Sequence, residues 1–80
     1  MPFFLLDHQH EPHECGAAFA AWQGFRSPLR HARVPSTCLT GSHRLWWHVK
    51  ADDGAAALAL LPKYVAERTD AVQVRDVEIP

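Results

Sequence analysis

The chain has 80 residues, of which 48% are apolar and 21% charged, a size that fits one small globular domain and excludes two. Eight basic and nine acidic side chains leave a net charge of −1, which provides no long-range field to attract nucleic acid or an anionic membrane surface. We therefore expect a soluble protein with neither partner. So short a chain buries a small core, which favours association with a second copy.

The first 24 residues predict a strand followed by a helix. Phe3–His10 begins as a continuous apolar run and turns polar, as expected for a central strand covered on both faces. Pro12 suits the first position of a helix that ends near Gly24. Apolar side chains at spacings of three and four give this helix an aromatic face, and they are Cys15, Phe19, Trp22 and Phe25.

The middle of the chain predicts a β-hairpin. Val34–Thr40 and His43–Lys50 are rich in residues that favour strands, and they flank the turn residues Gly41 and Ser42. In the second of these runs, alternation places Leu45 and Trp47 on the face that we expect to form the core.

The last third of the chain predicts a helix and a final strand. Asp52 and Asp53 provide acidic capping for an alanine- and leucine-rich helix over residues 54–68, and Pro62 should kink or restart it. Valines at alternating positions predict a strand over residues 71–79.

The resulting order, βαββαβ, resembles that of ferredoxin-like domains over nearly the whole chain. The resemblance implies a four-stranded antiparallel sheet with two helices on one face. It is similar to the broad group of small dimeric α/β-barrel proteins, in which two such sheets face each other, and this implies a homodimer formed through the open sheet face. That group includes monooxygenases, isomerases, haem-active proteins and nickel-binding members, so the resemblance implies a shape and no particular reaction.

This topology predicts that histidines distant in sequence meet at one end of the sheet. The expected strand order is fourth, first, third, second, and the third strand runs antiparallel to the first. The end of the first strand, the start of the first helix and the hairpin tip then lie together. The predicted metal ligands at this end are His8, His10, His13, Cys15 and His43, with Cys38 nearby. Imidazoles and a thiolate suit nickel, zinc or copper.

Other interpretations of these residues stay open. The histidines between positions 8 and 13 would also fit exposed polar positions at a strand exit, and Cys15 a small core position or an activated thiol. Since both faces of the first strand are equally apolar, the sequence does not decide whether His8 and His10 or Asp7 and Gln9 lie on the open face.

A second candidate site lies on the predicted third strand. Arg44, Trp46 and His48 share one face, which a partner subunit would cover in the dimeric group. They could line a cleft for a small aromatic or anionic molecule, with Arg44 as the charge partner and His48 as acid or base. Alternatively, Trp46 is an interface residue between two subunits.

The two cysteines and the absence of an export pattern favour a reduced, cytoplasmic protein. The apolar run at positions 3–6 is too short for the core of a signal peptide, and no stretch reaches the roughly 18–20 apolar residues of a membrane span. The sequence thus favours a metal-binding homodimer, with a small-molecule-binding protein or enzyme as the alternative. A scaffold whose histidines respond to pH is a third possibility.

Overall fold

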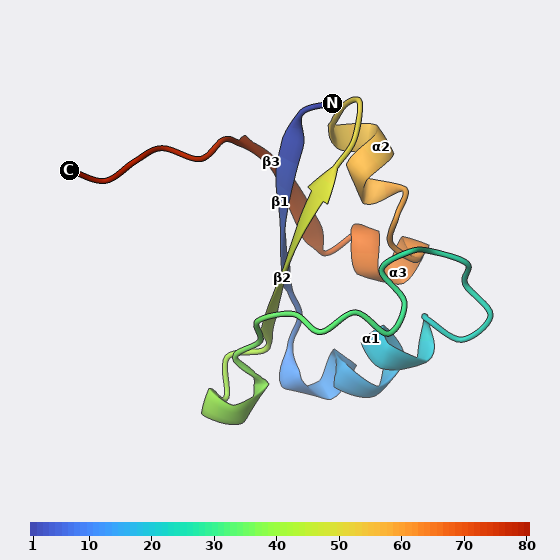
Figure 1. Cartoon of the computed structure of the whole chain (residues 1–80). Coiled ribbons are helices and arrows are strands. Elements are labelled where there is room, and N and C mark those ends of the chain that lie inside the picture. Colours follow the sequence, from blue (N-terminus) through green and yellow to red (C-terminus); the bar gives the residue numbers. More distant parts are fainter.

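The computed structural model describes all 80 residues and contains a three-stranded antiparallel sheet in the order β2-β1-β3. The central strand is β1 (Phe3–Gln9), which pairs with β2 (Arg44–Lys50) on one side and β3 (Thr69–Val74) on the other. Three short helices cover one face of this sheet (Figure 1). They are α1 (Cys15–Ala20), α2 (Gly54–Leu58) and α3 (Lys63–Ala66).

The prediction of a four-stranded ferredoxin-like sheet with two helices was therefore wrong. The missing element is the strand expected over residues 34–40. A single bridge from Ser36 to Leu45 is all that remains of it. Pro35 has no N–H to donate to a ladder. Nearby hydroxyls also compete for the backbone, because Cys38 N–H donates to Ser36 Oγ and Arg44 N–H to Thr37 Oγ1. The chain closes instead in a 3₁₀ turn, η2 (Cys38–Thr40), ending at Gly41 with a φ of 88°.

The two expected long helices are shorter and interrupted. A 3₁₀ turn, η1 (Pro12–Glu14), leads into α1, and turns continue from there to Gly24. The predicted break at Pro62 is confirmed, since it separates α2 from α3. Capping is confirmed too, because the Asp53 carboxylate accepts the Ala56 N–H at 2.7 Å.

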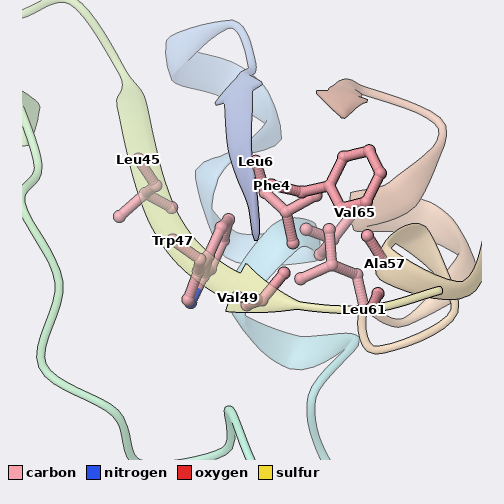
Figure 2. Close-up of a cluster of buried hydrophobic side chains, with 9 residues drawn as sticks. Phe4, Leu6, Leu45, Trp47, Val49, Ala57, Leu61 and Val65 are labelled. Atoms are coloured by element: carbon pink, nitrogen blue, oxygen red, sulfur yellow. The ribbon is translucent and has the colours of Figure 1, made fainter. Parts of the chain in front are cut away.

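The core lies between the helices and one face of the sheet. Alternate residues of β1 and β2 point toward the helices, as the period of two requires. Figure 2 shows Phe4, Leu6 and Val49 beside Ala57, Leu61 and Val65, with Leu45 and Trp47 farther along β2. The buried apolar cluster comprises Phe4, Leu6, Leu45, Trp47, Val49, Ala51, Ala57, Leu61 and Val65. The predicted inward placement of Leu45 and Trp47 is thus confirmed.

The other face of the sheet is uncovered within the single chain. Phe3 and Val72 are respectively 38% and 47% exposed there, and Leu5 is half-buried. Pairing of two copies through this face stays a prediction. β3 begins and ends earlier than expected, and residues 75–80 extend away from the body without secondary structure (Figure 1). No helix in the structure has both the length and the apolar character needed to cross a membrane.

Candidate metal centre

The end of β1 carries two histidines to the covered face of the sheet. His8 follows Phe4 and Leu6 in the inward register, and it is fully buried. His10, two residues on, is 4% exposed and donates its backbone N–H to the His43 carbonyl at 3.1 Å. The structure therefore decides the question that the sequence left open: His8 and His10 face the helices rather than the open side.

Three of the predicted ligands meet at this end of the sheet. His10, Cys15 and His43 each offer one donor atom, and these atoms lie within 4.8 Å of one another. The two imidazole rings are 5.3 Å apart between centroids. Each residue comes from a different part of the chain: His10 directly follows β1, Cys15 opens α1, and His43 directly precedes β2. The convergence predicted from strand pairing is confirmed for these three.

A chain of hydrogen bonds behind the cluster fixes how His10 is protonated. Thr69 Oγ1 donates to the Val65 carbonyl at 2.7 Å, so it can only accept from His8 Nδ1, which lies 2.9 Å away. The His8 Nδ1–H also faces the Val65 carbonyl at 3.3 Å. His8 Nε2 is then left as an acceptor, and it accepts the His10 Nδ1–H at 2.8 Å.

The consequence is that the remaining nitrogen of His10 carries a free lone pair. With its proton on Nδ1, neutral His10 presents an unprotonated Nε2, and this buried atom has no hydrogen-bond partner. His43 Nδ1 is likewise buried and unpartnered. Together with the Cys15 thiol, these two imidazoles form a group that could hold a metal ion.

Burial keeps the histidines in the form that binds metals. Burial lowers the pKa of His8 below its ordinary value, and nearby His10 lowers it further. The pKa of His10 is lowered by burial and then by His43. Both imidazoles are therefore held neutral near pH 7, and a metal ion needs a neutral imidazole.

An ion-paired glutamate anchors the segment that carries Cys15. Glu14 accepts hydrogen bonds from the Glu11 N–H at 2.9 Å, Arg68 Nε at 2.9 Å and the Tyr64 hydroxyl at 3.2 Å. The Glu11 N–H and the Arg68 guanidinium lower the pKa of Glu14 to about 2. Since Arg68 directly precedes the edge strand β3, this network links the start of α1 to the start of β3.

Two other predicted ligands lie outside the cluster. His8 uses both ring nitrogens in hydrogen bonds and so supports His10 from behind, in the manner typical of groups that orient a metal-bound imidazole. His13 is exposed on η1. The supporting role of Thr69 was not predicted, because the last strand was expected to begin two residues later. No sequence signal identifies this role, because the pairing of His8 with Thr69 is known only from the structure.

The second candidate site lies on the open face of β2, as its alternation predicted. Arg44 is paired with Asp7, with its Nη2 2.7 Å and 2.8 Å from the two carboxylate oxygens, and its guanidinium lies 5.3 Å from the Trp46 ring centroid. His48 stacks on Phe3 with centroids 5.0 Å apart. Ligand binding by Arg44, Trp46 and His48 stays a prediction.

Comparison of the chain with protein-family models, curated proteins and solved structures returned no significant match. Function is therefore inferred from the geometry of the cluster.

Proposed function

We propose that this protein binds a transition metal ion through His10 Nε2, Cys15 Sγ and His43 Nδ1. The single observation that carries this proposal is the cluster of His10, Cys15 and His43, in which one donor atom of each residue lies within 4.8 Å of the others and each imidazole has a buried nitrogen without a hydrogen-bond partner. The Thr69–His8–His10 hydrogen bonds support it, because they direct an imidazole lone pair into the cluster.

The donor set favours zinc, nickel or copper. Two neutral imidazoles and a thiolate are ligands of intermediate softness, which these ions prefer over the carboxylates and waters that suit magnesium or calcium. Three protein ligands also leave one position of a tetrahedral ion free for water or another molecule, as in sites that exchange ligands. We infer a site that takes up and presents its metal rather than one closed by four protein ligands.

Closing the cluster around an ion requires only a small movement. The donors of a tetrahedral zinc ion lie roughly 3.3–3.6 Å apart, so a pair at the 4.8 Å limit of the cluster must approach by roughly 1.2–1.5 Å. Cys15 and His43 are half-buried and can make this adjustment by side-chain rotation, while His10 is held by its hydrogen bonds.

Cobalt titration of the purified, metal-free chain tests the proposal. Cobalt(II) should give the intense visible bands of a tetrahedral ion and the near-ultraviolet band of a cobalt–thiolate bond, and zinc should displace it in a 1:1 ratio. Cys15→Ser should remove the thiolate band, and His10→Ala should weaken binding by more than the roughly 10–100-fold loss that follows removal of an outer partner.

His13→Ala is the matched control, since His13 is exposed and lies two residues from Cys15. Wild-type binding by this variant is expected. An unchanged cobalt spectrum in Cys15→Ser, or equal losses in His13→Ala and His10→Ala, would overturn the proposal.

A further inference from the structure

A cavity of about 350 Å³ lies beside α1, on the covered side of the sheet. Its walls come from the end of α1, the irregular segment of residues 29–34 and the inward face of β2. None of the three proposed metal ligands lines it, so it is a separate site. Its volume falls at the lower end of the range for small-molecule sites, which suits a ligand with one or two rings.

The walls of this cavity are aromatic. Trp22 and Trp47 both line it, with ring centroids 6.0 Å apart and planes tilted by 41°. Phe19 also lines it and is 52% exposed, which is high for so large an apolar side chain. Such surfaces favour a flat, apolar ligand, because aromatic rings stack and bury area against one another.

The polar groups of the cavity are cationic or neutral. Arg30, His31 and Gln23 line it, and no acidic side chain does. The ion pairs of this protein involve Arg44 and Arg68, so Arg30 has no carboxylate partner. A planar guanidinium without a partner suits a carboxylate, which it can bind through two parallel hydrogen bonds.

The backbone beside Arg30 is held in an uncommon conformation. His31 has a φ of 69°, and it is the one residue other than glycine with a positive φ. Arg30 and His31 both line the cavity at this left-handed position. Local strain of this kind often accompanies binding segments.

We propose that this cavity binds a small planar aromatic carboxylate, with its rings packed against Phe19, Trp22 and Trp47 and its carboxylate on Arg30. This site differs from the one predicted around Trp46 on the open face, and it does not depend on the proposed metal centre.

Nuclear magnetic resonance of the three tryptophan indoles gives a direct test with 2-naphthoate as the probe. In the full chain kept metal-free with a chelator, the indole N–H signals of Trp22 and Trp47 should shift in a saturable way. The signal of Trp46 is an internal control, since Trp46 lies on the opposite face of β2. Absence of a shift at millimolar 2-naphthoate, or equal shifts of all three signals, would overturn the proposal.

Two substitutions test where the ligand binds and which residue contacts its carboxylate. Ala32 is exposed and lines the cavity, so Ala32→Phe should fill the site and weaken 2-naphthoate binding by at least tenfold, whereas Ala59→Phe, which is exposed elsewhere, should not. Arg30→Gln should weaken 2-naphthoate roughly fivefold and leave the neutral 2-naphthamide unchanged. Unaltered binding in Ala32→Phe would disprove the site, and an equal effect of Arg30→Gln on both probes would disprove the role of Arg30.

Discussion

The two ends of the covered sheet face are built on the same strands but carry different side chains. Along β1, Phe4 and Leu6 contribute to an apolar core under α2 and α3, whereas His8 and His10 continue the same inward register in polar form. Both ends are buried. At one end the inward side chains are apolar and pack together, whereas at the other His8 and His10 are hydrogen-bonded and one nitrogen each of His10 and His43 has no partner.

This difference teaches that burial alone does not distinguish an end that is fully packed from one that keeps donor atoms available for a ligand. A fully buried imidazole must find partners for both nitrogens or lose stability, and His8 does so through Thr69 and His10. His10 and His43 do not, although apolar side chains in their places would avoid that cost. Substitutions at the two ends should therefore separate stability from metal binding.

The largest effect is expected at the apolar end. Leu6 is fully buried at the centre of the cluster, so Leu6→Ala should lower the free energy of unfolding by about 2–5 kcal/mol through lost transfer energy and a residual cavity. Urea unfolding of the metal-free protein measures this loss. Val72→Ala, on the exposed face, should change it by less than about 0.5 kcal/mol. Equal losses in Leu6→Ala and Val72→Ala would contradict a core that lies on one face of the sheet.

Metal should stabilise the histidine end specifically. Zinc at 100 times its dissociation constant should raise the free energy of unfolding by about 2.7 kcal/mol. Cys15→Ser should lose most of this gain, and His13→Ala should retain it. Thermal melts with and without zinc measure the difference. A gain that survives in Cys15→Ser would place the ion outside the cluster.

Replacing His8 should affect both stability and metal affinity. His8→Leu leaves the buried His10 Nδ1–H without an acceptor, which should cost about 1–3 kcal/mol in the metal-free protein. It also frees the His10 ring to turn, so metal affinity should fall roughly 10–100-fold. His48→Leu on the open face is the matched control and should change neither quantity by much. Wild-type affinity in His8→Leu would contradict a positioning role.

The sequence predicted local patterns well and one long-range pairing poorly. Alternation in β2, the Asp53 cap and the Pro62 break depend on nearby residues and were confirmed. The strand over residues 34–40 depended on a competition between ladder bonds and the hydroxyls of Ser36 and Thr37, which composition alone does not decide. The ferredoxin-like fold was wrong for that reason.

The candidate site, like the fold, was predicted only in part. The meeting of His10, Cys15 and His43 required only that β1 and β2 pair in antiparallel fashion, and this could be inferred from strand order. The different roles of His8 and His10 could not be inferred from the sequence. Both lie on one face, and only the register that sets His8 beside Thr69 shows which imidazole supports and which one offers a lone pair.

The smallest effect concerns pH, and it separates the histidines from the Glu14 network. The pKa values of His8 and His10 are lowered in the folded protein, so below about pH 6.5 the unfolded chain binds protons that the folded chain does not. The stability of the metal-free protein should therefore be greatest above pH 7 and decline as the pH falls toward 5. The groups near His8 are His10, Arg68 and Glu14.

Glu14 cannot account for a decline in that range. Its pKa falls from 4.5 to about 2 on folding, so the stability that it contributes is complete above pH 4.5 and is lost only as the pH falls from there toward 2. Urea unfolding of the metal-free chain at pH 7, 6 and 5 should show the decline in the wild type and a shallower one in His8→Leu. A flat wild-type profile would mean that the buried imidazoles accept protons in the folded state, which for His8 requires breaking the hydrogen bond that its Nε2 accepts from His10 Nδ1–H.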